Sequence, residues 1–168
     1  MTATRYARVL GGAAALVAGL SGCAYDTTAC AGVGVVAHVG VFFAQEGYGD
    51  LAGASVRLCA NGRCVEDRLR KESVSTIDLP LPDDIGRDLG TVRFRVTPEG
   101  GTTPLVDASA HKKLDFQSDQ CGGGAYNGGL AFTKEGGLTA EIPKSVSKAL
   151  RRQIMDRATG APVTSPSR

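Results

Sequence analysis

One short segment of the chain carries the three side-chain types of a serine hydrolase. Asp107, Ser109 and His111 stand at every second position of an expected strand, so their side chains would share its polar face. Neighbours on one strand face are about 7 Å apart, whereas a nucleophile, a base and an orienting acid need contacts of about 3 Å. No Gly-x-Ser-x-Gly turn is present to expose a nucleophile. We therefore expect a solvated strand face here and no catalytic triad.

Candidate metal ligands are few. His38 alternates with glycines, valines and a phenylalanine, which is typical of a partly buried or rim residue in a strand. Asp83, Asp84 and Asp88 crowd an expected loop, but their spacing does not match that of a calcium-binding loop. A solvated acidic turn is the expected structure. The sequence thus predicts no metal ion and no cofactor.

The two closest cysteines favour a disulfide. Cys59 and Cys64 flank Ala60-Asn61-Gly62-Arg63, and Asn-Gly is the strongest short hairpin signal because both turn positions need a positive φ. In that hairpin the cysteines form a non-hydrogen-bonded pair with Cα atoms ~4.5 Å apart, within reach of a disulfide. The same register makes two further favourable cross-strand pairs, Leu58 with Val65 and Arg57 with Glu66. We predict a disulfide-closed hairpin.

The N-terminal segment has the parts of an export signal. Arg5 and Arg8 precede an apolar run from Val9 to Leu20, which is shorter than the ~20 residues of a membrane-spanning helix. The sequence Leu20-Ser21-Gly22-Cys23 that ends it resembles the lipobox of bacterial lipoproteins. This resemblance implies cleavage before Cys23, a diacylglycerol thioether on its sulfur and fatty acids such as palmitate. The alternative is an ordinary secretory signal with a chance cysteine.

Lipidation of Cys23 would leave four cysteines, an even number that predicts disulfides in an exported chain. With Cys59 joined to Cys64, Cys30 and Cys121 pair by elimination. In the chain-entropy model this long loop removes roughly 4–5 kcal/mol from the unfolded state, against about 2 kcal/mol for the hairpin. The long bridge is therefore expected to be the main covalent stabiliser.

Charge and cleavage together divide the chain. We expect a signal peptide over residues 1–22, a tether over 23–29, a folded domain over 30–143 and a basic helix or disordered tail over 144–168. The tail has six basic residues and one acidic residue, while residues 23–143 have 11 basic and 16 acidic residues. An acidic body with a basic tail is not the footprint of a nucleic-acid-binding protein, so no nucleic-acid partner is expected.

The body alternates apolar and polar residues over short segments that turn residues separate. The expected strands cover Val33–Phe43, Ser55–Leu58, Ile77–Leu81, Val92–Thr97, Val106–Phe116, Leu130–Phe132 and Leu138–Ile142. In the Val106–Phe116 segment, Phe116 is expected on the inward face. Seven to nine such strands without intervening helices predict an all-β, antiparallel β-sandwich.

This pattern resembles an immunoglobulin-like or transthyretin-like sandwich, although the chain has no tryptophan and so lacks the buried one of antibody domains. It also resembles small secreted lipoproteins of actinobacteria with no known activity, through the lipobox, the Cys-hairpin-Cys unit and the bias towards Ala, Gly, Val and Arg. After the sandwich, Val146, Leu150 and Ile154 recur every four residues behind Pro143. They predict a short amphipathic helix with these three side chains as its apolar anchors.

Two glycine-containing segments are the candidate binding loops, since loops on a rigid scaffold usually carry recognition. They are Gln45–Asp50, with Tyr48 and Asp50, and Gly122–Gly129, with Tyr126 and Asn127.

The sequence therefore predicts a non-catalytic β-sandwich, lipid-anchored on the extracytoplasmic face of a bacterial membrane. It would act by contact with an envelope protein or polymer, and its basic tail would add attraction to anionic headgroups. A small-ligand-binding lipoprotein is one alternative and needs a pocket at the Tyr48 or Tyr126 loop. A hydrolase is the other, and needs His38 or His111 in a cleft with perturbed titratable groups.

Overall fold

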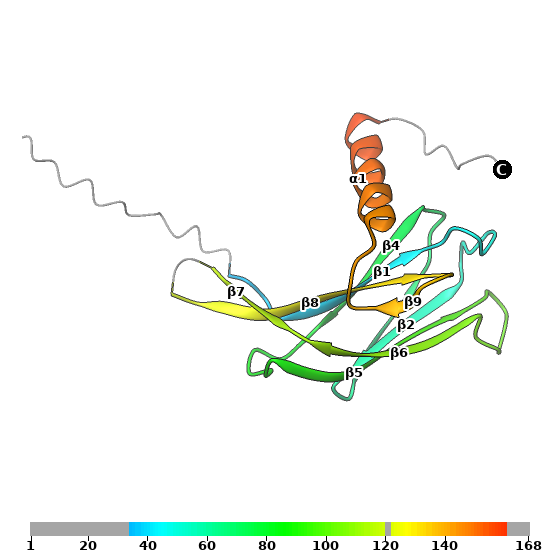
Figure 1. The fold of residues 1–168 in the computed structure, drawn as a ribbon. Helices are drawn as coiled ribbons and strands as arrows, with labels where there is room; N and C mark the ends of the chain where they lie inside the picture. The colour runs from blue at the N-terminus through cyan, green and yellow to red at the C-terminus, as the bar shows by residue number, and fades with distance from the viewer. Residues whose placement is uncertain (1–33, 120–121, 161–168) are drawn as a thin grey trace, which may run out of the picture. The chain divides into compact units, whose positions relative to one another are not determined.

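The computed structural model describes residues 34–119 and 122–160, which form nine strands in two sheets and one helix (Figure 1). Sheet A has the order β4-β1-β8-β7, with β9 also paired to β8, and sheet B has the order β3-β2-β5-β6. The strands of sheet A are β1 (His38–Ala44), β4 (Val74–Pro80), β7 (Asp115–Ser118), β8 (Gly124–Thr133) and β9 (Gly137–Thr139). Those of sheet B are β2 (Ser55–Ala60), β3 (Arg63–Arg68), β5 (Asp88–Thr97) and β6 (Val106–Lys113). The chain folds as the predicted β-sandwich.

The core lies between the two sheets because successive side chains of a strand point to opposite faces. Phe43 of β1 is fully buried, and its ring centroid lies 5.5 Å from that of Phe94 on β5 and 5.8 Å from that of Phe132 on β8. Aliphatic residues of the same strands also belong to the core, among them Val39, Val41, Val92, Val96 and Leu130. The predicted inward positions of β1 and β5 are confirmed.

The predicted hairpin and its disulfide are present. Asn61 and Gly62 have φ angles of 47° and 71°, as a two-residue loop between right-twisted strands requires. Cys59 lies opposite Cys64 with a Cα–Cα separation of 4.1 Å, and their sulfurs are bonded. The two flanking pairs also have the predicted register, Leu58 with Val65 and Arg57 with Glu66.

Two features of the strand arrangement differ from the prediction. The pairing is not antiparallel throughout, because β1 and β8 run parallel over His38–Phe43 and Asn127–Phe132. The immunoglobulin arrangement separates its second and third strands into different sheets, whereas here β2 and β3 share sheet B with β5 and β6. The immunoglobulin-like alternative is therefore wrong, and the transthyretin-like one stays a prediction.

The segment expected as one strand over Val106–Phe116 is two strands in different sheets. It breaks at Leu114, which is fully buried and donates its N–H to the carbonyl oxygen of Arg87 at 2.7 Å. Strands that switch sheets bend at such corners, and β7, which follows the bend, is exposed at all four of its residues. Phe116 is consequently 59% exposed, contrary to the prediction, and its ring packs edge-on against Tyr126 with centroids 5.4 Å apart.

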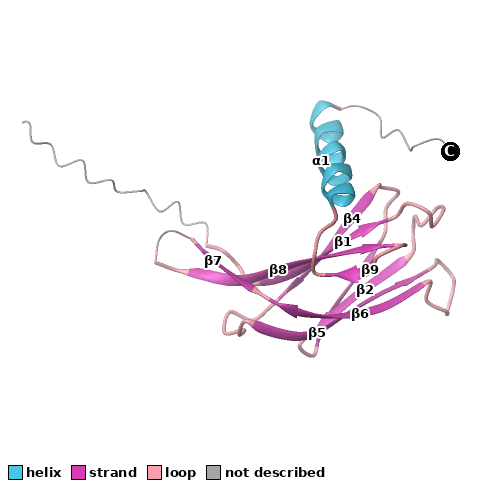
Figure 2. Cartoon of the chain, in the orientation of Figure 1, coloured by secondary structure: helices cyan, strands magenta, loops and turns pink. Residues whose placement is uncertain are grey.

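The predicted C-terminal helix is α1 (Lys144–Thr159), which stands on the outer side of sheet A (Figures 1 and 2). The backbone N–H of Gly160 caps the last turn by donating to the carbonyl oxygens of Arg157 and Asp156, and Gly160 has the left-handed conformation. Two of the three predicted anchors behave differently from expectation. Val146 is buried, Leu150 is half-buried and Ile154 is 55% exposed.

A buried glutamine supplies the docking contacts that Leu150 and Ile154 were expected to make. Gln153 is 7% exposed, and its side-chain Oε1 accepts the backbone N–H groups of Ser73 and Val74, each at 3.1 Å. Its Nε2 donates to the carbonyl oxygen of Val74 at 3.0 Å and to Glu72 at 3.1 Å. Since β4 is an edge strand, its backbone groups need such partners when something covers them. The helix is therefore docked by polar complementarity to a sheet edge.

Several predictions fall outside the described residues. These are the signal peptide over 1–22, the lipidated Cys23, the tether over 23–29, the Cys30–Cys121 disulfide and the final residues 161–168. Within the described ranges, no helix has the length and hydropathy needed to cross a membrane.

Candidate functional site

The outer face of sheet B carries a row of charges that crosses all four strands. Glu66 of β3, Arg57 of β2, Arg95 of β5 and Asp107 of β6 follow one another in register. Because these residues alternate with the buried core positions, all four lie on the solvent side of the sheet. The two arginines are direct neighbours in the middle of the row, and like charges opposite each other destabilise a sheet.

Asp107 compensates part of this repulsion. Arg93 donates from Nε to Oδ1 at 2.9 Å and from Nη2 to Oδ2 at 2.8 Å, and Arg95 donates from Nη2 to Oδ2 at 2.7 Å. The hydrogen bonds from Arg93, and then those from Arg95, lower the pKa of Asp107 to about 2. One carboxylate thus binds two guanidinium groups on the outer face of the sheet.

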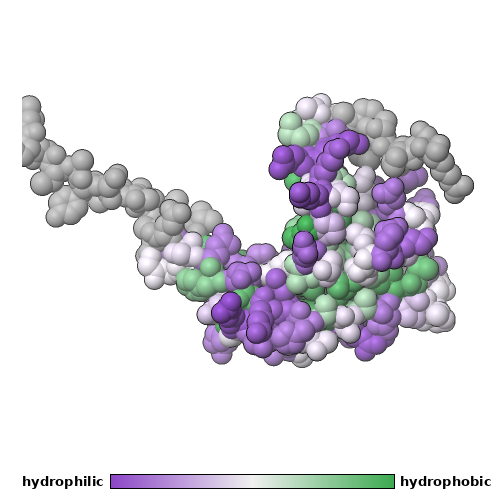
Figure 3. Space-filling view, viewed as in Figure 1, coloured by the Kyte–Doolittle hydropathy of each residue, from purple (hydrophilic) through white to green (hydrophobic). Residues whose placement is uncertain are grey.

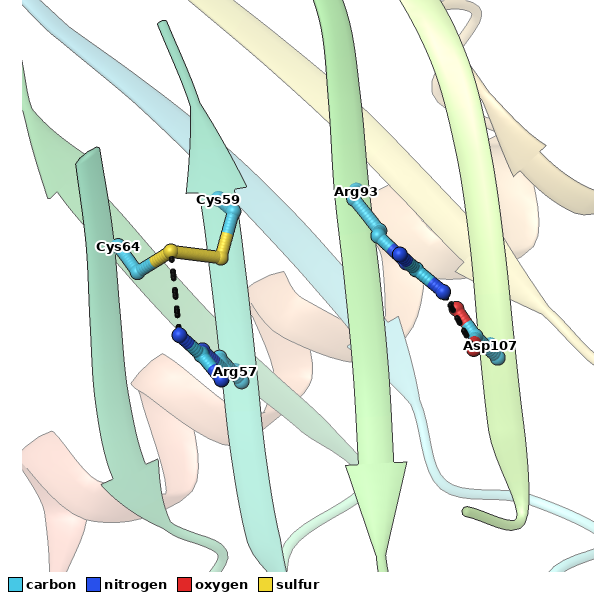
Figure 4. The surroundings of a disulfide bond; sticks show 5 residues. All are labelled: Arg57, Cys59, Cys64, Arg93 and Asp107. Atoms are coloured by element: carbon cyan, nitrogen blue, oxygen red, sulfur yellow. Dashed lines mark hydrogen bonds and ion pairs between the residues drawn. A yellow bond between two sulfur atoms is a disulfide. The ribbon is translucent and has the colours of Figure 1, made fainter. Parts of the chain in front are cut away.

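Arg57 has a different surrounding. Its Nη2 lies 3.6 Å from the sulfur of Cys64, as Figure 4 shows beside the Arg93–Asp107 pair. Glu66, its cross-strand neighbour, accepts a hydrogen bond from the Ser55 hydroxyl at 2.8 Å instead. In the part of the chain that the structure describes, Arg57 takes part in no ion pair. Its positive charge is available to a partner.

The three side chains of the hydrolase pattern share the outer face of β6 as predicted, and all are exposed. Asp107 forms ion pairs with Arg93 and Arg95, and Nε2 of His111 lies 3.1 Å from Oδ1 of Asp88. Ser109 lies opposite Arg93. Among the described residues, no hydrogen bond joins any two of Asp107, Ser109 and His111.

His38 lies at the start of β1, and its Nδ1 is 3.2 Å from the carbonyl oxygen of Val36. Asp83, Asp84 and Asp88 are all exposed, and Asp88 accepts the backbone N–H of Gly90 at 2.9 Å. Over residues 34–119 and 122–160, no group of three or more His, Cys, Asp or Glu side chains is placed to hold a metal ion.

The first candidate binding loop is a loop, but its tyrosine packs against the core. The Tyr48 ring centroid lies 5.7 Å from that of Phe43 and 6.4 Å from that of Phe132. Lys134 covers the ring, with its Nζ 5.4 Å from the centroid. Burial, and secondly the charge of Glu135, raises the pKa of the Tyr48 hydroxyl. Asp50 is exposed and accepts the N–H of Ala52 at 3.0 Å.

The second candidate binding loop is mostly strand, contrary to the prediction. Tyr126 and Asn127 lie in β8, which pairs with β7 along this stretch and with β1 from Asn127 onward. Oδ1 of Asn127 accepts the N–H of His38 at 3.1 Å, and its Nδ2 donates to Gln117 at 3.2 Å. The glycines here permit close packing, since a Cβ on Gly128 would meet the side chains of Lys112 and Leu114. These residues connect strands and do not form a free loop.

The structure adds a groove that the sequence did not reveal. It lies between α1 and the outer face of sheet A and has a volume of about 320 Å³. Its lining comprises Phe42, Ile142, Val146, Ser147, Leu150, Arg151, Ile154 and Met155. Neither candidate loop nor either histidine contributes to it. Adjacent apolar residues at Ile154-Met155, on a helix that needs only one apolar stripe, were the available signal.

Comparison with known proteins gives no guide to function. No protein-family model matches this chain, and no curated protein or solved structure is significantly similar to it. The candidate sites therefore rest on their own geometry. They are the arginine-rich outer face of sheet B and the apolar groove beside α1.

Proposed function

We propose that this chain is a lipid-anchored, extracytoplasmic lipoprotein whose β-sandwich acts by binding and not by catalysis. The lipobox-like Leu20–Cys23 segment is the motif behind the proposed anchor. The observation that carries the proposal furthest is the Cys59–Cys64 disulfide, because disulfides persist in oxidising compartments outside the cytoplasm. Cys23 lies only 11 residue steps before Gly34, at most about 40 Å of extended chain, so the sandwich stays near the bilayer.

The binding surface is the outer face of sheet B, and the partner is an envelope protein or polymer that carries anionic groups. Arg57, without a carboxylate partner among the described residues, and Arg95 beside it support this choice. An arginine fork binds carboxylate or phosphate groups in a bidentate manner. An anionic ligand would also relieve the like-charge contact between the two strands.

The anchor is tested by the intact mass of the protein purified from a host that processes lipoproteins. We expect an N-terminus at Cys23 with a diacylglycerol thioether, and a Cys23→Ser variant that leaves the membrane fraction or retains the leader. A free thiol at Cys23 in the mature protein, or an unlipidated chain that still begins at Met1, would contradict the anchor.

The binding surface is tested by crosslinking on intact cells with a photoreactive residue in place of Ser109, which is exposed on this face opposite Arg93. We expect an adduct that Arg57→Gln weakens. Arg87→Gln is the matched control, since Arg87 is exposed and lies outside the arginine row. Equal adduct yields in the two variants would remove the arginine row from the binding site.

A further inference from the structure

The helix α1 exposes more apolar side chain than its docking requires. Its contact side is built from Val146 and Gln153, which are 2% and 7% exposed. Successive helical residues are rotated by about 100°, so Ile154 and Met155 point away from this side. They are 55% and 59% exposed. An exposed apolar pair beside an apolar groove marks a contact surface.

The groove extends this apolar surface onto the sandwich. Phe42 of β1 and Ile142, just before the helix, form its sheet side, and Leu150 with Ile154 forms its helix side. Figure 3 shows hydrophobic residues at the base of α1, with hydrophilic residues above them and weakly hydrophobic ones towards the far end of the helix. The apolar area is therefore continuous from the sheet to the helix.

Basic side chains border this area. Lys144, Lys148, Arg151 and Arg152 are all exposed, and within the described residues none of them forms an ion pair. The single acidic residue of α1, Asp156, is half-buried and lies one-third of a turn from Met155. Arg157 differs from the other four, because it pairs with Glu72 at 2.7 Å beside the docking contact. Four exposed basic side chains against one half-buried acidic side chain give this surface a net positive charge.

We infer that this surface, Phe42 and Ile142 with the open side of α1, seats on an anionic lipid bilayer. A helix whose apolar side chains are flanked by Lys and Arg buries its apolar face about 5–10 Å into the headgroup region. The basic residues add attraction to anionic lipids. Charge complementarity selects the bilayer over an uncharged apolar partner. The inference rests on the proposed lipid anchor, which keeps a membrane within reach, but it adds an orientation. Sheet A faces the membrane and the arginine row of sheet B faces away from it.

The test uses the full chain, purified from a host that processes lipoproteins and reconstituted into vesicles. An environment-sensitive fluorophore is attached to Met155→Cys, and in a second sample to Ser109→Cys on the opposite sheet. With vesicles of phosphatidylcholine and phosphatidylglycerol we expect the Met155 label alone to shift to shorter wavelength and to become protected from an aqueous quencher. The protection should fall when salt is raised from 0.1 to about 1 M, which shortens the Debye length from ~10 to ~3 Å.

Charge variants sharpen the test. Lys148→Gln with Arg152→Gln should lower the ratio of inserted to free label about 25-fold, since each basic residue near the surface contributes a factor of about five. Lys113→Gln with Arg87→Gln removes the same charge from exposed sites away from α1 and should leave the ratio unchanged.

Three outcomes would overturn the inference: a Met155 label that stays in water with anionic vesicles, equal insertion into phosphatidylcholine alone, or protection without any vesicles. The last would mean that a protein segment occupies the groove. The intact mass of the same samples reports separately on the anchor. A missing diacylglycerol with an inserted Met155 label would reject the lipoprotein assignment and keep the membrane contact.

Discussion

The outer faces of the two sheets differ in what covers them. Each sheet must present one face to the core and leave the other to something else. Sheet B leaves its outer face to water and lines it with polar and charged residues such as Arg57, Arg95 and Asp107. Sheet A places small or apolar residues on its outer face at Gly40 and Phe42 and has α1 beside them.

The difference is visible in the sequence as the regularity with which apolar and polar residues alternate along a strand. A sheet with one wet face has a clean alternation of apolar and polar residues, whereas a sheet covered on both faces has nearly continuous apolar runs. β5 is of the first kind, with Val92, Phe94 and Val96 between polar residues. β1 is of the second kind, and its sequence HVGVFFA has one polar residue in seven. An interrupted alternation therefore indicates that a further element covers the strand.

The largest expected effect comes from the core that both faces share. Phe43→Ala should destabilise the fold by about 3–5 kcal/mol, because it removes a fully buried ring that contacts both sheets. Phe116→Ala is the control, since that ring is 59% exposed. Equilibrium urea unfolding measures both. A similar loss for the two variants would show that Phe43 does not join the sheets as described.

The next effect separates sheet A from sheet B. Gln153→Ala should lower the free energy of unfolding by about 2–3 kcal/mol, since it leaves backbone groups of Ser73 and Val74 without their hydrogen-bond partner. Hydrogen exchange should rise most at Val74 and along α1, and less in β2 and β5. Arg152→Ala, at an exposed site one residue away, should change stability by less than about 0.5 kcal/mol. Unchanged exchange at Val74 in Gln153→Ala would contradict polar docking of the helix.

The matching change on sheet B is the loss of its disulfide. Replacing both Cys59 and Cys64 by Ser should lower the unfolding free energy by about 2 kcal/mol, as the chain-entropy model gives for so short a loop. Local hydrogen exchange should rise most in the β2–β3 hairpin, and amides of α1 that exchange by local opening should keep their rates. Faster exchange of these amides would show that the two faces are energetically coupled.

The smallest effect is a pH dependence of sheet B. The arginines hold the pKa of Asp107 at about 2 in the folded state, below its ordinary value of about 3.9 in an unfolded chain. Its contribution to stability is thus complete above about pH 4 and is lost as the pH falls towards 2. Asp107→Asn should remove this part of the acid-unfolding curve and leave the curve unchanged near pH 7 apart from a constant offset. Superimposable slopes between pH 4 and 2 would contradict the ion-pair cluster.

Local signals predicted the sheet B side well. The Asn61-Gly62 turn fixed the register of the hairpin, and with it the Cys59–Cys64 bridge. The alternation around Phe94 was enough to place β5. In both regions, each residue's position depends on neighbours that are close in sequence or on burial alone, and a single sequence reports both.

Sheet A was harder to predict because its contacts join distant parts of the chain. The pairing of β8 with β7, and from Asn127 onward with β1, made Tyr126 and Asn127 strand residues, although their glycine-rich surroundings favour a loop. Phe116 is exposed because it lies on β7, after the chain has crossed between sheets at Leu114. Gln153 was overlooked because its partners at Ser73 and Val74 are about 80 residues away, and nothing local marks a polar helix residue as an anchor.

The central place of β1 has a mechanical consequence. This strand is hydrogen-bonded on both sides, to β4 and to β8, and it is the first strand after the proposed tether. A pull on the chain that precedes β1 would load this strand first, and both of its ladders of hydrogen bonds would have to break to release it. Forced unfolding is governed by the unfolding rate. A domain tethered in this way resists pulling from the membrane side better than it would if its edge strand β4 were first in the chain.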